Sequence, residues 1–358
     1  MRKVLVCGAA LAATCLSAVA AVPTAGATPP PTPKRTAPTV FPSEETGTTP
    51  PSDGPETPGG ETSSPPPSRR VPVTRSGAGV TDGVVSAKAV MVTPRPPRFV
   101  TYAYGKSSRQ RIDAYWRQSE PRAKPRPAVL VLHGGYWLGG DKRGWKYFAR
   151  RLTDQGYVVL AANYRLASQS PWPAQRDDAL SALTFLKKHA ATWNADPRRV
   201  VVVGSSSGGM LATQLGTYGT GAERVRGVIA LSPPNNPYLA FQDGLKPSAL
   251  LTQRKLRRAV VDLVRCTPGA DAGGGCWKRL DDANSATHVS PGDAPMLLMH
   301  ASGDFVPVTQ STGLASALRA AGVPVAVKVV PGELHASELL NDEHTYPLIL
   351  KWLRAHSR

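Results

Sequence analysis

A serine lies at the centre of the sequence Gly-Ser-Ser-Ser-Gly over residues 204–208, directly after four valines. Valines favour a buried strand, and the residues from Met210 to Leu215 have helical spacing. Between a strand and a helix, Gly-x-Ser-x-Gly is typical of a nucleophile elbow, which exposes the central hydroxyl above the sheet edge. The pattern predicts Ser206 as a nucleophile. The alternative is an ordinary loop rich in glycine and serine.

A serine hydroxyl is a weak nucleophile at neutral pH and needs a base within hydrogen-bonding reach. Asp304 and His335 each follow an apolar run, in the chain order serine, acid, histidine that elbow enzymes use. His335 would take the Ser206 proton and return it to the leaving group, while Asp304 would fix the imidazole tautomer. The alternatives are a turn-capping aspartate and a surface histidine.

Other titratable residues are weaker candidates. His300 ends a strand-like run, so we expect a structural role for it. Glu333 is a minor alternative acid. Three aspartates do not follow a predicted strand and are weaker acid candidates, namely Asp281, Asp282 and Asp293.

The run His133-Gly134-Gly135-Tyr136-Trp137 follows an apolar segment and precedes a predicted helix. Its two glycines would let backbone N–H groups turn toward the elbow. With the N–H of Ser207 they would form an oxyanion hole, in which each donor contributes roughly 3–4 kcal/mol. The alternative is a plain strand-to-helix turn.

The elements that must position these residues alternate between strands and helices, which predicts an α/β fold with a mainly parallel sheet covered on both faces. The first two predicted strands form a hairpin. Residues 233–293 break the alternation and are expected to be a lid-like insertion over the carboxyl edge of the sheet. The predicted strands are 99–104, 111–116, 128–132, 157–163, 200–203, 228–231, 296–299 and 325–330, and the helices are 145–152, 173–190, 210–215, 308–321 and 346–355.

The N-terminal part of the chain has a different composition. Residues 1–27 read as a signal peptide, with a basic start, an alanine-rich apolar run and a small-residue cleavage site. Residues 28–98 read as a disordered tether, because the stretch 28–67 holds 13 prolines in 40 residues. The folded domain is expected at 99–358, and the protein is expected to be secreted or associated with the cell wall.

Cleavage of the signal would leave two of the four cysteines, Cys266 and Cys276. In an oxidising compartment, such a close pair predicts a local disulfide, and the alternative is two free thiols. The spacing does not match a zinc site.

The formal net charge is +18. The basic residues are scattered and are not interleaved with aromatic ones, so we do not expect nucleic acid as a partner. The charge is expected to form a soluble basic surface, and the alternative is weak electrostatic association with an acidic cell envelope.

Over residues 125–355 the sequence resembles the α/β-hydrolase superfamily, and within it the hormone-sensitive-lipase/carboxylesterase group with its feruloyl-esterase-like relatives. Further motifs that carry the resemblance are the run Asn163-Tyr164-Arg165-Leu166, Pro173, Asp178 and the pair Asp196-Pro197. The resemblance implies Ser206, Asp304 and His335 as the triad. It implies the N–H groups of Gly135, Tyr136 and Ser207 as oxyanion donors, and no metal or organic cofactor. The chain departs from the group at Tyr136, where many relatives have a third glycine, and in the serines that flank Ser206.

The expected function is a secreted serine esterase that acts on small or polymer-linked carboxylic esters through an acyl-enzyme. The run His-Gly-Gly-Tyr-Trp also resembles arylformamidases, which keeps an amide-type substrate open. A catalytically silent envelope-binding protein is the alternative from another class. The sequence does not predict acyl-chain length or oligomeric state.

Overall fold

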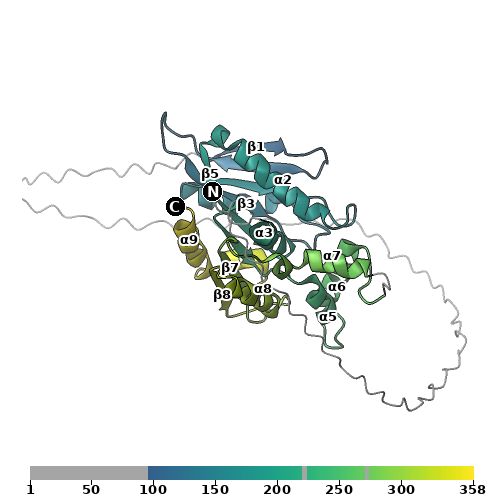
Figure 1. The fold of residues 1–358 in the computed structure, drawn as a ribbon. Helices are drawn as coiled ribbons and strands as arrows, with labels where there is room; N and C mark the ends of the chain where they lie inside the picture. Colours follow the sequence, from purple (N-terminus) through teal and green to yellow (C-terminus); the bar gives the residue numbers. More distant parts are fainter. Residues whose placement is uncertain (1–95, 220–223, 271–273) are drawn as a thin grey trace, which may run out of the picture. The chain divides into compact units, whose positions relative to one another are not determined.

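A computed structural model describes residues 96–219, 224–270 and 274–358 (Figure 1). The expected signal peptide and nearly all of the expected tether lie outside these residues. Among the residues described, we find no helix with the length and apolar character needed to span a membrane.

Eight strands form one sheet in the order β1-β2-β4-β3-β5-β6-β7-β8. β2 pairs antiparallel with both β1 and β4, and the remaining neighbours are parallel, so only β2 runs against the others. This confirms the mainly parallel sheet and the expected first hairpin. The strands are β1 Arg98–Ala103, β2 Arg111–Trp116, β3 Arg126–Leu132, β4 Val158–Ala162, β5 Ala195–Ser205, β6 Gly227–Leu231, β7 Met296–Ala301 and β8 Val325–Val330.

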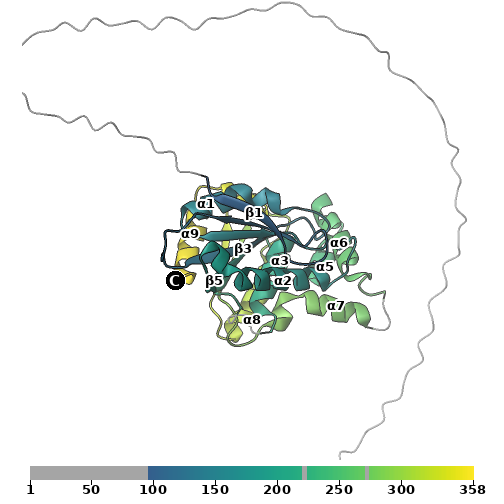
Figure 2. The ribbon, with the colours of Figure 1, turned by 90° about the horizontal axis from the view of Figure 1, so that it is seen from above.

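Helices cover both faces of the sheet, as Figure 2 shows from above. Side chains of α2 (Ala174–Lys188), α3 (Ser207–Thr217) and α8 (Thr309–Ala320) join one apolar core. Side chains of α1 (Lys146–Asp154) and α9 (Thr345–His356) join the other. Alternate valines of β5 point into the two cores, which explains why this strand reads as a continuous apolar run.

The expected insertion forms helices α5 (Pro237–Asp243), α6 (Leu251–Val264) and α7 (Gly275–Ala283), followed by a short 3-10 helix, η3 (Ser285–His288). The predicted disulfide is present between Cys266 and Cys276, so it ties the segment after α6 to the first turn of α7. These helices lie together beside the sheet in Figure 1.

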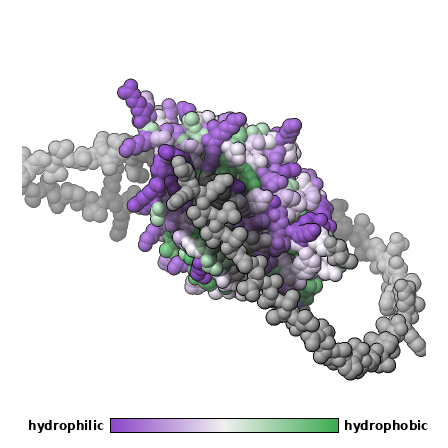
Figure 3. All heavy atoms as spheres, viewed as in Figure 1, coloured by the Kyte–Doolittle hydropathy of each residue, from purple (hydrophilic) through white to green (hydrophobic). Residues whose placement is uncertain are grey.

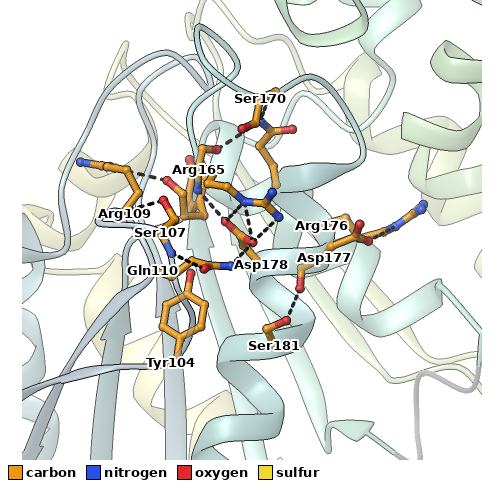
Figure 4. A network of polar contacts seen from close by, with 12 residues as sticks. Tyr104, Ser107, Arg109, Gln110, Arg165, Ser170, Arg176, Asp177, Asp178 and Ser181 are labelled. Carbon is orange, nitrogen blue, oxygen red and sulfur yellow. Dashed lines mark hydrogen bonds and ion pairs between the residues drawn. The ribbon is translucent and has the colours of Figure 1, made fainter.

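Asp178 on α2 is the centre of a polar network that holds the loop after β4 (Figure 4). Its carboxylate accepts a hydrogen bond from the Arg165 backbone N–H at 2.8 Å and from the Arg165 guanidinium at 2.7 Å. The side chain of Gln110, just before β2, donates to the same carboxylate at 2.8 Å. Asp178 is almost fully buried, so this network fixes the start of β2 and the loop after β4 against α2.

We expect Asp178→Ala to lower the free energy of unfolding by about 3 kcal/mol, because it leaves the partly buried Arg165 guanidinium without its counter-charge. Urea denaturation measures this loss. Asp177→Ala is the matched control, since the neighbouring carboxylate is 55% exposed, and should change stability by less than about 0.5 kcal/mol. Equal losses in the two variants would show that the buried Asp178 carboxylate does not stabilise the fold more than an exposed one does.

Candidate active site

The elbow motif forms the turn between β5 and α3. β5 ends at Ser205 and α3 begins at Ser207, which leaves Ser206 between them with φ 49° and ψ −124°. A non-glycine residue rarely adopts such angles, and they occur mainly where the surrounding structure imposes them at functional sites. The Ser206 N–H donates to the carbonyl of Leu231 at 2.7 Å, which ties the strained turn to the end of β6.

Two glycines of the motif allow close contact between the backbones around the turn. A Cβ atom on Gly204 would lie 2.1 Å from the Gly208 carbonyl oxygen. A Cβ atom on Gly208 would lie 2.2 Å from the His133 carbonyl oxygen. Both carbonyls belong to the backbone and cannot rotate away. Larger residues at these two positions would therefore push β5, α3 and the segment at His133 apart.

Asp304 and His335, far apart in sequence, form a hydrogen-bonded pair. His335 Nδ1 lies 2.7 Å from Asp304 Oδ1, and the Asp304 side chain is fully buried whereas that of His335 is 22% exposed. The Val306 N–H also donates to Asp304 Oδ1, at 2.9 Å. When the imidazole is neutral and donates from Nδ1, its Nε2 atom can accept a proton.

The loops that carry this pair are held side by side. The Ser302 N–H donates to the Val330 carbonyl at 2.9 Å, and the Gly303 N–H donates to the Gly332 carbonyl at 2.8 Å. The Phe305 ring packs on the His335 ring with centroids 4.2 Å apart. The acid and the histidine are thus positioned at the adjacent ends of β7 and β8.

Ser206 and His335 line the same cavity, which has a volume of about 290 Å³. Glu338, whose carboxylate accepts the His335 backbone N–H at 2.9 Å, lines it as well. Asp141 is a further lining residue, and hydrogen bonds from Arg143 and Asn163 lower its pKa to about 2 despite partial burial. The walls come from residues 133–136 and 140–145, from the elbow, and from residues 335–338.

The segment after β3 contains three successive residues with positive φ: Gly135 at 124°, Tyr136 at 61° and Trp137 at 59°. For Tyr136 and Trp137 this conformation is strained, and such residues cluster at functional sites. A Cβ atom on Gly134 would lie 2.9 Å from the Ser205 carbonyl oxygen and 3.0 Å from the Ser206 Cβ. This segment therefore contacts the elbow directly.

The side chain of His133 contacts the backbone of the segment after β3. Its Nδ1 lies 2.8 Å from the Gly134 carbonyl, and its ring stacks on Tyr164 with centroids 4.3 Å apart. Burial lowers the pKa of His133 to about 4, so the ring is neutral near pH 7. Tyr164 donates from its hydroxyl to the His133 carbonyl at 2.8 Å, which gives the Asn-Tyr-Arg-Leu motif a structural role.

Helix α6 of the insertion contacts residues beside the site. Lys255 of α6 places its ammonium 4.6 Å from the centre of the Tyr136 ring, and Tyr136 stacks parallel to Phe305. None of the described residues in 233–293 lines the cavity that holds Ser206 and His335. The lining of this cavity comes instead from residues 133–136, from residues 140–145, from the elbow and from residues 335–338.

The weaker candidates bind other groups. Asp281 accepts from Thr287, Asp282 pairs with Arg176, and Asp293 accepts from Ser290. Glu333 is exposed on the loop before His335. No sequence pattern singles out Asp141 or Glu338, although both line the cavity.

A chain of buried hydrogen bonds joins the elbow helix to the loop of Asp304. Thr213 of α3 donates to Asn235 at 2.8 Å, and Asn235 donates to the Ser311 hydroxyl at 3.2 Å. Ser311 contacts Nε2 of His300 at 2.7 Å, and Nδ1 of His300 donates to the Val306 carbonyl at 3.0 Å. Burial lowers the pKa of His300, so its ring acts as a neutral link, in keeping with the expected structural role.

Comparisons with known proteins find similar esterases. The chain is 27% identical over 251 residues to the probable carboxylic ester hydrolase LipM of Mycobacterium tuberculosis, covering 66% of this chain and 56% of LipM. It is 28% identical to esterase LipC of the same organism, over 68% of this chain and 61% of LipC. The chain thus spans little more than half the length of these relatives.

A solved structure and a family model extend the likeness to the fold. The crystal structure of esterase B from Lactobacillus rhamnosis matches with a TM-score of 0.60 and 21% identity, covering 74% of this chain and 86% of esterase B. A family model described as alpha/beta hydrolase fold matches residues 129–339, which include the elbow, Asp304 and His335. The chain therefore belongs to the alpha/beta-hydrolase fold family.

Proposed function

We propose that this protein is a serine esterase that cleaves carboxylic esters through an acyl-enzyme. The observation that carries the proposal is the Asp304–His335 pair at 2.7 Å, whose imidazole lines one cavity with the strained Ser206. Membership of the family and the similarity to LipM and LipC support ester hydrolysis as the reaction.

In the first half of the reaction, Ser206 Oγ attacks the ester carbonyl carbon while His335 Nε2 takes the hydroxyl proton. The tetrahedral intermediate then expels the alcohol, to which His335 returns that proton, and the acyl group stays on Ser206. In the second half, His335 removes a proton from water, the hydroxide attacks the acyl carbon, and Ser206 leaves with that proton. Asp304 keeps the imidazole oriented and stabilises its cationic form.

The negative oxygen of each intermediate needs hydrogen-bond donors in place before the reaction. We assign this role to the backbone N–H groups of Gly135, Tyr136 and Ser207. Two observations support the assignment: the positive φ angles at Gly135 and Tyr136, and the position of Ser207 in the first turn of α3. The positive end of that helix adds to the stabilisation.

We also propose that the protein works outside the cytoplasm, after removal of residues 1–27. The Cys266–Cys276 disulfide supports an oxidising compartment. The compartment can be tested by N-terminal sequencing of the protein recovered from the culture medium or cell wall, which should begin near residue 28.

The proposed reaction is tested with a fluorophosphonate probe and three substrates. We expect covalent labelling at Ser206, located by peptide mass spectrometry, and faster turnover of p-nitrophenyl acetate or butyrate than of an aryl formamide. The ester should react faster because p-nitrophenol leaves readily, whereas the amine of a formamide must first be protonated by His335. Faster formamide turnover would favour the arylformamidase alternative, and absence of both labelling and turnover would favour a silent binding protein.

A further inference from the structure

Three leucines around the turn between α5 and α6 are in contact with solvent. Leu245 is 52%, Leu250 is 55% and Leu251 is 80% exposed. Single exposed leucines are common, but a group of them marks an interaction surface. On the face shown in Figure 3, hydrophilic side chains lie among smaller groups of hydrophobic ones.

The turn packs on the start of α6, which places the leucines in one region. A Cβ atom on Gly244 would lie 2.6 Å from the Gln253 carbonyl oxygen, so the turn contacts the helix directly. Arg254 donates from its guanidinium to the Pro247 carbonyl at 3.2 Å, and the Leu250 N–H donates to the Gln253 side chain at 3.0 Å. We call residues 245–258 the α6 surface.

The α6 surface is strongly basic. It includes no acidic residue, and Asp243, which precedes it, pairs with Lys246 at 2.6 Å. Lys246, Arg254, Lys255 and Arg258 are all exposed, and Arg257 is partly buried. Exposed leucines and cationic side chains in one segment match a lipid surface with anionic headgroups, because contact with it lowers the free energy of both kinds of group.

This surface lies at the rim of the proposed active site. Gln253 donates to the Phe305 carbonyl at 3.2 Å, and the Phe305 ring packs on His335. Lys255 lies over the ring of Tyr136, which lines the cavity. A lipid surface bound to residues 245–258 would therefore lie next to the opening of the cavity.

We infer that the α6 surface docks the protein onto an anionic lipid surface. Two identical copies of this surface would repel each other by their positive charge, which disfavours self-association as its role. A polyanion such as nucleic acid would use the cations but would gain nothing from the leucines. The inference goes beyond the proposed esterase activity and does not require it.

The test is flotation of the full chain with vesicles of phosphatidylcholine, with and without about one quarter phosphatidylglycerol. We expect binding to the anionic vesicles and at least about tenfold less to the neutral ones, and a further decrease as salt rises from about 0.1 M to about 0.5 M. Leu251→Ser should weaken binding severalfold, and the triple change Leu245→Ser, Leu250→Ser, Leu251→Ser at least about tenfold. The matched control, Leu348→Ser, changes a 43% exposed leucine on α9 and should bind as the unchanged protein does.

Three outcomes would overturn the inference. The first is equal binding to both vesicle types. The second is binding to soluble heparin and to anionic vesicles with affinities that the leucine changes leave unaltered. The third is a dimer that forms without lipid and is lost in the triple variant. The unfolding temperature of each variant shows whether it is folded. Ser206→Ala should bind vesicles normally, so failure of docking and failure of the proposed catalysis give different results.

Discussion

Ser206→Ala is expected to lower kcat for p-nitrophenyl acetate by at least about 10⁴-fold, because removal of the nucleophile prevents formation of the acyl-enzyme. Residual turnover would come from stabilisation of the intermediate and from substrate binding alone. The measurement is steady-state hydrolysis with correction for spontaneous reaction, together with loss of fluorophosphonate labelling.

Ser181→Ala is the matched control, since this exposed hydroxyl on α2 donates to the Asp177 carbonyl within its own helix. Its kcat should stay within about twofold of the unchanged protein, as for most surface substitutions. If Ser206→Ala retained a tenth or more of the activity, another nucleophile would have to be sought.

Asp304→Asn is expected to lower kcat by about 10³-fold or more at neutral pH. The change keeps the size of the side chain but removes the negative charge that stabilises the imidazolium during proton transfer. Because Asp304 is fully buried, solvent cannot replace that charge. The kcat of the folded variant, with its unfolding curve measured in parallel, gives the effect on catalysis separately from any effect on stability.

Glu333→Gln provides the comparison, because it removes a carboxylate from the exposed loop just before His335. Its kcat should change by less than about threefold, since an exposed charge is screened by solvent. A large loss in Glu333→Gln combined with a small loss in Asp304→Asn would transfer the role of the acid to Glu333.

The proximity of Asp304 and His335 is predictable from sequence because parallel strands end at one edge of the sheet. Asp304 and His335 each follow a strand, and the adjacent positions of β7 and β8 bring them together. The strand–turn–helix around Ser206 is predictable as well, because the valine run of the strand ends at the Gly-x-Ser-x-Gly motif. The local sequence pattern and the order of elements along the chain therefore suffice to predict the position of a residue that directly follows a strand.

Residues whose position depends on loop packing are not predictable in this way. Asp141 lines the cavity because Asn163, 22 residues later, donates to its carboxylate at 2.8 Å. Glu338 is placed by the 3-10 helix η4 (Ala336–Asn341), which has no apolar period to reveal it. The helical pattern predicts α3 only from Met210, whereas the helix begins at Ser207, because tertiary packing around Gly208 and Gly209 overrides their low helix propensity.

The buried chain from Thr213 through Asn235 and Ser311 to His300 has a consequence for recombination between relatives. Its members come from α3, the segment after β6, α8 and β7, so any crossover between residues 213 and 311 separates donors from acceptors. A chimera whose second parent has different side chains there would bury a polar atom without its partner, which costs about 1–3 kcal/mol. Gene fragments spanning all four segments should therefore be exchanged as one block.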